Sequence, residues 1–276
     1  MRRVRDLVRD PSALRAAARA GLWIGTTARH CPDYQQCNVV FLPAALAGEF
    51  AAFCTRNPGP CPLIEVTPPG DPVPRLSAPG ADLRTDVPAY RVYRGGELVA
   101  SLRDLLDVWR GDLVGFLLGC SHTFEHALAE AGVEIRHHVC GTTVPMFVSS
   151  LPCVPAGRFA GPMVVTMRPV PVHQLALVLE LSARYPHAHG VPVHVGDPAE
   201  IGIRDLGRPD YGEPVTVAAG EVTVFWGCGV TPQAVAREAR PDLMITHEPG
   251  QMFLTDLPRE AVPGQRAAPA LRPQEV

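Results

Sequence analysis

Two distant segments of this chain repeat one pattern: a short apolar run, a Gly-Cys pair and a helix-forming stretch. The pair at Cys120 follows the apolar run 113–118, and the pair at Cys228 follows the run 222–226. Runs of this length are typical of buried strands. Thr231, which is followed by proline, has the residue type of a helix N-cap. The sequence therefore predicts two strand–turn–helix units with a cysteine at each turn.

A cysteine between a strand and a helix lies where backbone N–H groups converge and the helix dipole is positive. Such a position binds carboxylates and stabilises thiolates. Equivalent strand ends of a parallel sheet lie at one edge, so we expect Cys120 and Cys228 to face one cleft. The alternative is a duplicated βα unit whose cysteines only pack, because free cysteine is among the most buried residue types.

The composition excludes several classes of protein. The 276 residues are 46% hydrophobic and 19% charged, with a net charge of -3, which favours neither nucleic acid nor an anionic membrane as a partner. The basic start at 1–9 leads into Asp10-Pro11 rather than an apolar core, so it does not resemble a secretory signal. Eight cysteines without a CxxC pair indicate reduced thiols in the cytoplasm. No dinucleotide, Walker, serine-hydrolase or HExxH motif occurs, so we expect no organic cofactor.

The order of elements predicts an α/β protein with two lobes and a largely parallel or mixed sheet flanked by helices. Besides the two repeats, strands are expected at 38–42, 63–66, 90–93, 98–101, 163–167, 191–195 and 243–246, and helices at 10–20, 44–55, 102–109 and 173–185. We assign residues 1–144 and 221–258 to a three-layer α/β lobe, 145–220 to a smaller α+β lobe and 259–276 to a tail.

Several polar residues at element ends are candidates for binding a substrate. Arg84 and Arg91, close to Asp86, could clamp a carboxylate through paired hydrogen bonds. The alternative is an Asp/Arg surface network, which is the commoner use of such a run. Gln36 and Asn38 precede or begin a strand and could orient a ligand, or could close a turn.

Four histidines could together form a metal site. His187, His189 and His194 lie close together and are followed by Asp197, while His247 follows a predicted strand. Their spacing fits no compact metal motif, although four such ligands would suit a divalent ion. We therefore predict no metal, and we expect these histidines to serve as hydrogen-bonding or acid/base groups.

Seven motifs in order resemble one known family. They are NPGPCPL at 57–63, DLRTDVPAYR at 82–91, GCSHTFE at 119–125, GPMVV at 161–165, HGVPVH at 189–194, WGCGVTPQ at 226–233 and THEPG at 246–250. Together they resemble the D-glutamate cyclase family, whose bacterial members are mostly called hydro-lyases. The resemblance implies a two-lobed α/β fold and a lyase-type activity. The named reaction is loss of water from D-glutamate as its amine closes on the side-chain carboxyl, giving 5-oxo-D-proline.

The chain departs from the family pattern at four places. Residues 147–150 read Phe-Val-Ser-Ser where the family usually has Tyr-Arg-Thr-Asn. His122 replaces an aromatic residue, Gln251 stands where histidine is common, and Asp33 stands where glycine is common. If the segment 147–150 contacts the ligand, the pocket has lost a guanidinium. D-glutamate would then be a poor substrate, and a less charged or more apolar acid would be preferred.

The sequence as a whole favours a cytoplasmic lyase or cyclase that acts on a small amino or hydroxy acid. The predicted catalytic residues are Cys120 and Cys228, with Glu125 or His122 as acid or base. The predicted substrate-binding residues are Arg84, Arg91, Asp86, Gln36, Asn38, Ser121, Thr231, Ser150, His189, His194 and His247. Two alternatives stay open: a cofactor-independent racemase with two cysteines, and a non-catalytic protein that binds a small carboxylate. The partner is a small carboxylate, and a homodimer is left open.

Overall fold

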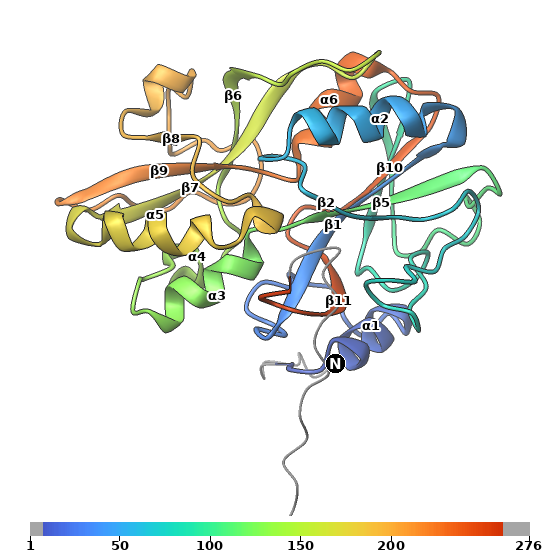
Figure 1. The fold of residues 1–276 in the computed structure, drawn as a ribbon, viewed down its shortest axis with the longest axis horizontal. Helices are drawn as coiled ribbons and strands as arrows, with labels where there is room; N and C mark the ends of the chain where they lie inside the picture. The colour runs from blue at the N-terminus through green and yellow to red at the C-terminus, as the bar shows by residue number, and fades with distance from the viewer. Residues whose placement is uncertain (1–7, 262–276) are drawn as a thin grey trace, which may run out of the picture.

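Two antiparallel sheets lie next to each other in the computed structural model, which describes residues 8–261 (Figure 1). The first sheet has the order β2-β5-β1-β10-β3-β4, and β11 pairs with β1 outside this path. Its strands are β1 (Tyr34–Pro43), β2 (Leu63–Val66), β3 (Tyr90–Arg94), β4 (Glu97–Leu102), β5 (Leu113–Gly119), β10 (Met244–His247) and β11 (Phe253–Pro258).

The second sheet is smaller and has the order β6-β7-β9-β8. Its strands are β6 (Met146–Pro152), β7 (Pro162–Pro171), β8 (His194–Val195) and β9 (Glu221–Gly227). In Figure 1 this sheet lies on the left, next to the first sheet on the right. The chain therefore passes from the first sheet to the second and returns through β10 and β11.

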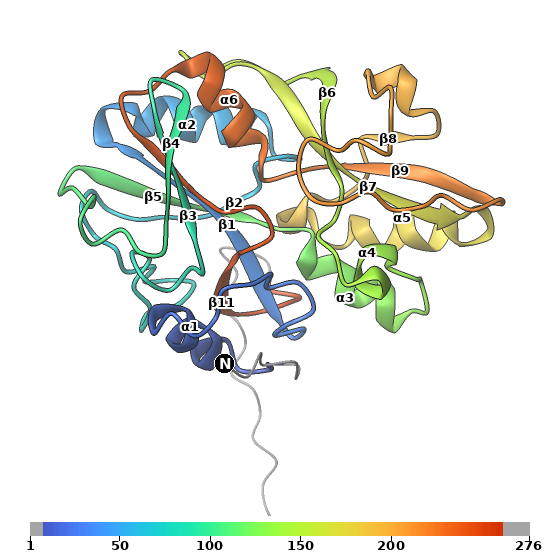
Figure 2. The ribbon, with the colours of Figure 1, turned by 180° about the vertical axis from the view of Figure 1, so that it is seen from behind.

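Helices and loops cover both sheets. Helices α2 (Ala44–Arg56) and α6 (Thr231–Ala239) pack on one face of the first sheet, and Figure 2 shows them side by side from behind. Helices α3 (His122–Glu130) and α5 (Leu175–Ala183) pack against the second sheet, with the short α4 (Arg136–Cys140) near α3. Helix α1 (Pro11–Arg19) packs on β11. None of the helices between residues 8 and 261 has the length and apolarity that a membrane crossing requires.

The mixed α/β class is confirmed, but the expected parallel pairing is wrong. Every strand pair in residues 8–261 is antiparallel. Strand β1 explains the error, because nine of its ten residues are buried. A strand covered on both faces has a continuous apolar sequence, which is the usual signature of a parallel strand. The sequence pattern reports burial of both faces and not the direction of the neighbouring strand.

Three local predictions also need correction. Residues 103–109 form turns rather than a helix, and the amide of Leu105 donates to the carbonyl of Arg84. The strand expected at 191–195 shrinks to two residues, because Pro192 has no N–H for the ladder. Thr231 is not the N-cap of α6, a position that Val230 occupies. Its hydroxyl instead donates to the carbonyl of Cys228 at 2.6 Å.

The strand pairing bears on the expected division into lobes. Residues 221–258 were expected in the first lobe, but β9 pairs with β7 in the second sheet, whereas β10 and β11 pair in the first. Arg259, the first residue of the expected tail, forms an ion pair with Glu130 at 2.9 Å. Residues 262–276 of that tail lie outside the described part of the chain.

Candidate active site

One pocket lies where β5 and β9 end and the two helices after them begin. Its inner cavity is about 20 Å³, within about 320 Å³ of space that includes the open mouth. The pocket is lined by residues from both sheets: Asn38, Cys120, Ser121, His122, Thr143, Val144, Met146, Thr166, His189, Cys228, Gly229, Val230, His247, Gly250 and Met252. No side chain of Arg, Lys, Asp or Glu is among these lining residues.

Cys120 and Cys228 both line this pocket, as the repeated pattern predicts. The reason differs from the expected one, because β5 belongs to the first sheet and β9 to the second. The two strand ends meet between the sheets rather than at one edge of a single sheet. At the start of α6, the N–H of Val230 donates to the sulfur of Cys228 over 3.4 Å.

The glycines next to these cysteines allow close packing around the pocket. A Cβ on Gly119 would lie 1.6 Å from the carbonyl oxygen of His187. A Cβ on Gly229 would lie 2.0 Å from the side-chain nitrogen of Asn38. That nitrogen donates to the carbonyl of Gly119 at 2.7 Å, so Asn38 joins the two Gly-Cys turns. The close approach explains why these turns need glycine.

Burial keeps both thiols protonated. It raises the pKa of Cys228 to about 11, against the opposing effects of the Val230 N–H and Arg168. It also raises the pKa of Cys120, although the N–H of His122 donates to that sulfur and opposes the shift. At neutral pH both groups are therefore thiols, which can donate a proton, rather than thiolates.

Three histidines line the pocket in their neutral form. Burial lowers the pKa of His122 to about 3 and the pKa values of His189 and His247 to about 4. One nitrogen of each ring is held by the protein. Nδ1 of His122 lies 3.3 Å from Oε1 of Gln36, and Nδ1 of His189 lies 2.7 Å from the carbonyl oxygen of Gly59. Nδ1 of His247 lies 3.4 Å from the backbone nitrogen of Val39, and its Nε2 has no hydrogen-bond partner among the described residues.

A buried ion pair supports the pocket wall from outside the lining. Arg168 of β7 donates to Glu125 of α3 through Nε at 2.9 Å and again through Nη2. His137 and His138 of α4 approach the same carboxylate, at 3.3 and 3.1 Å. Burial alone would raise the pKa of Glu125, but Arg168 and the two histidines outweigh it and hold that pKa well below its usual range. This cluster joins the second sheet to α3 and α4.

The same cluster has the donor set of a metal site. Ligand atoms of Glu125, His137 and His138 all lie within 4.8 Å of one another. Arg168 occupies the same carboxylate, however, and its positive charge opposes a cation at this place. The guanidinium also lies over the rings of Phe124 and Trp226, 5.2 and 5.1 Å from their centroids. We interpret the cluster as an ion-pair network.

Comparisons with known proteins identify the family. A family model described as D-glutamate cyclase matches residues 114–256. A protein of Rubrobacter xylanophilus is 57% identical over 242 residues, which cover 88% of this chain and 93% of that protein. A protein of Geobacillus kaustophilus is 55% identical over 235 residues, which cover 85% and 89%. Both are described as "putative hydro-lyase".

The chain belongs to the D-glutamate cyclase family. Among solved structures, the nitrogen repressor-like protein MJ0159 of Methanococcus jannaschii matches with a TM-score of 0.38 and 8% identity, over 89% of this chain and 98% of that chain. A similarity of this size supports no conclusion about function. The matched region of the D-glutamate cyclase family contains both pocket cysteines, whereas Asn38 lies before it.

The segment that departs from the family pattern does not line this pocket. Phe147 and Val148 face a separate, open groove with Arg204 and Arg208. The hydroxyl of Ser149 donates to the carbonyl of Met163 at 2.7 Å. Ser150 lies beside Gly202, also away from the pocket. The expected loss of a guanidinium from the pocket wall therefore has no basis in this segment.

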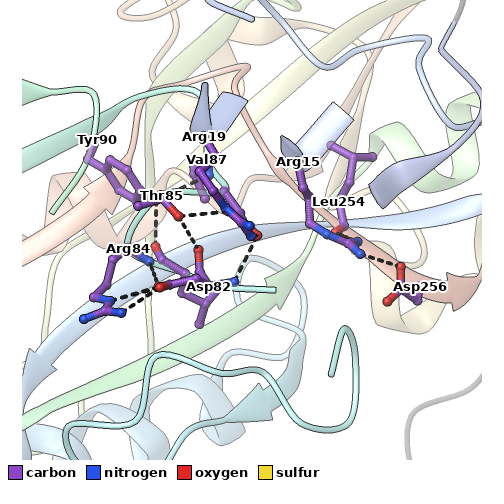
Figure 3. Close-up of polar contacts among 11 residues, drawn as sticks. Arg15, Arg19, Asp82, Arg84, Thr85, Val87, Tyr90, Leu254 and Asp256 are labelled. Carbon is purple, nitrogen blue, oxygen red and sulfur yellow. Dashed lines mark hydrogen bonds and ion pairs between the residues drawn. The ribbon is translucent and has the colours of Figure 1, made fainter. Parts of the chain in front are cut away.

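Two predicted substrate ligands are held in an ion-pair network in the segment before β3. Figure 3 shows the guanidinium of Arg84 against Asp82, whose carboxylate it contacts at 2.7 Å. Asp86 is fully buried and accepts two hydrogen bonds from Arg19, at 2.7 and 2.6 Å. These residues therefore form the Asp/Arg network that was the alternative to a carboxylate clamp. Neither Arg84 nor Asp86 lines the pocket.

Five further predicted residues also lie outside the lining. Arg91 is paired with Glu248 through two hydrogen bonds, at 2.9 and 2.5 Å. Nε2 of His194 lies 2.8 Å from the carbonyl oxygen of Asp197. The others are Gln36, which contacts His122 from outside the lining; Thr231, which contacts β7; and Glu125, which Arg168 holds. The pocket does bring together Cys120, Cys228, His122, Asn38, Ser121, His189 and His247.

Sequence reasoning missed several residues of the site. Thr166 lies inside the apolar strand β7, where nothing distinguishes it from a buried threonine of the core. Met252 and Thr143 line the pocket from loops. The pair His137-His138 next to Arg136 was the one local signal that could have indicated the network around Glu125. The side chain of Arg168 is held by Glu125 outside the lining.

Proposed function

We propose that this pocket removes water from a small amino or hydroxy acid, as a carbon–oxygen lyase of the D-glutamate cyclase type. The observation that carries the proposal is the meeting of two protonated thiols and three neutral imidazoles in one small pocket. Elimination of water needs one group that accepts a proton and one that donates a proton to the departing hydroxyl. Neutral imidazole and thiol are those two groups.

The roles follow from the protonation states. A neutral imidazole, with His122 next to Cys120 as our choice, takes a proton from the substrate. The thiol of Cys228 gives its proton to the departing hydroxyl, which leaves as water while the C–O bond breaks. The imidazolium then returns the proton to the thiolate, so the site is restored. Glu125 is tied to Arg168 and two histidines, so we assign it to positioning and not to proton transfer.

A substrate screen tests the reaction class. Purified protein is incubated with small amino and hydroxy acids, and mass spectrometry detects the loss of water. We expect monocarboxylic acids to be turned over better than D-glutamate, because no charged side chain lines the pocket to pair with a second carboxylate. A racemised but hydrated product would indicate the two-cysteine racemase instead. Stabilisation by a ligand without turnover would indicate a binding protein.

Replacing Cys228 by serine is expected to lower kcat/KM by about 10²–10⁴-fold with little change in stability. Serine keeps the size of the side chain, but its hydroxyl is a far weaker acid than a thiol. The measurement is steady-state kinetics on the best acid from the screen, together with the melting temperature. Cys140→Ser is the matched control, because Cys140 is exposed and lies at the end of α4. Full activity in Cys228→Ser would remove this thiol from the mechanism.

A further inference from the structure

Two hydroxyl groups in the pocket wall share one buried guanidinium. Nη2 of Arg168 donates to the hydroxyl oxygen of Ser121 at 2.8 Å, and Nη1 donates to that of Thr166 at 3.0 Å. Ser121 is the N-cap residue of α3, and Thr166 lies in β7. Both line the pocket, whereas Arg168 does not. The start of α3 and strand β7 thus contribute one hydroxyl each to the same wall.

Each of these hydroxyls has a proton without an acceptor. A hydroxyl carries one donor and two acceptor lone pairs. In both residues the oxygen accepts from Arg168, and neither hydroxyl donates a hydrogen bond to a described residue. Ser121 is 4% exposed and Thr166 is 2% exposed. Because a buried donor without an acceptor is costly, the pair calls for an acceptor inside the pocket.

We propose that the hydroxyls of Ser121 and Thr166 bind a carboxylate of the ligand, and that Arg168 is the positioning residue that directs both. This subsite rests on the pocket's being the ligand site of the proposed function, but it makes a claim about binding alone. Two donors match the two oxygens of one carboxylate. Arg168 polarises both hydroxyls, the N-terminus of α3 adds positive potential, and no acidic side chain lines the pocket.

A purely structural role predicts a different behaviour. If the hydroxyls only hold Arg168 in place, removing one would lower stability and would weaken binding of charged and neutral ligands alike. If the hydroxyls instead bind a carboxylate, removing one should weaken the binding of the charged ligand only. Acetate and acetamide separate the two cases, because they have nearly the same shape and only acetate carries a charge.

The experiment is a titration followed by NMR chemical shifts, with sodium acetate or acetamide added to wild type, Thr166→Val, Thr166→Ser and Ser121→Ala at constant ionic strength. Wild type should bind acetate more tightly than acetamide. Thr166→Val and Ser121→Ala should each weaken acetate binding about tenfold or more, the effect of one lost hydrogen bond to a charged group. Acetamide binding should change about twofold or less, and Thr166→Ser should stay close to wild type because it keeps the hydroxyl.

Several results would overturn the proposal. One is a folded Thr166→Val protein with the wild-type ratio of acetate to acetamide affinity, and another is a wild type that does not prefer acetate. If the melting curve shows that Thr166→Val does not fold, the ratio of acetate to acetamide affinity is measured in Ser121→Ala instead. An unchanged ratio in that variant would overturn the proposal. Acetate selectivity that depends on both hydroxyls, in a protein that turns over none of the screened acids, would support this subsite while contradicting the proposed lyase.

Discussion

Replacing Arg168 by methionine is expected to lower the free energy of unfolding by about 3–5 kcal/mol, because it leaves the buried carboxylate of Glu125 without its main counter-charge. Arg168 and Glu125 are 3% and 0% exposed, so water cannot replace the lost partner. His137 and His138 also contact that carboxylate, at 3.3 and 3.1 Å. Urea unfolding at pH 8 measures the change.

Arg184→Met is the matched control for this variant. Arg184 pairs with Glu180 one helical turn away, and both side chains are more than 60% exposed. An exposed pair contributes about 0–1 kcal/mol, so this change should be nearly silent. A second comparison is the double variant Arg168→Met with Glu125→Leu, which leaves no unpaired charge and should recover part of the loss. Equal effects of Arg168→Met and Arg184→Met would show that the buried network adds no special stability.

Most elements were predictable because they have local causes. Asp10 caps α1 through the amide of Ser12 at 2.8 Å, as its position before a proline-initiated helix indicates. The Gly95-Gly96 turn joins β3 and β4, the strands expected at 90–93 and 98–101, and two glycines between two strands are a hairpin signal. Strand direction was not predictable in the same way. It depends on which strands become neighbours, and β1 pairs with β5, β10 and β11, all distant in the chain.

The centre of the site was predictable, but its support was not. The Gly-Cys pairs carried a local signal, since glycine and cysteine between a strand and a helix indicate close packing at a site. Arg84 and Asp86 carried an equally clear charge pattern, yet neither is free to bind a substrate. Arg84 pairs with Asp82, and Asp86 pairs with Arg19. Arg168 acquires its role only from contact with Ser121 and Glu125, more than 40 positions earlier in the chain, and Thr166 acquires its role from contact with Arg168. No periodicity or spacing reports a contact of that kind.

The folded protein is expected to lose stability steeply as the pH falls from about 6.5 toward 4. Burial lowers the pKa of His122 to about 3 and the pKa values of His189 and His247 to about 4, from an ordinary value of 6.5. In this window the unfolded chain takes up protons that the folded protein excludes, so the free energy of unfolding decreases with decreasing pH. At pH 5 each of the three contributes a loss of about 2 kcal/mol, or about 6 kcal/mol together. A typical domain has about 5–15 kcal/mol in total, so a large share of the stability should be lost, and urea unfolding at pH 7.5 and pH 5 measures the difference.

His189→Asn is the variant that isolates one of these contributions. His189 has a left-handed backbone with φ of 80°, which asparagine tolerates, and an asparagine amide can still donate to the carbonyl of Gly59. The difference in unfolding free energy between pH 7.5 and pH 5 should shrink by about 2 kcal/mol, even if the variant is less stable at every pH. His173→Asn is the control, because that side chain is exposed and meets water in both states. A His189→Asn protein that keeps the full wild-type dependence on pH would show that His189 is not held neutral in the pocket.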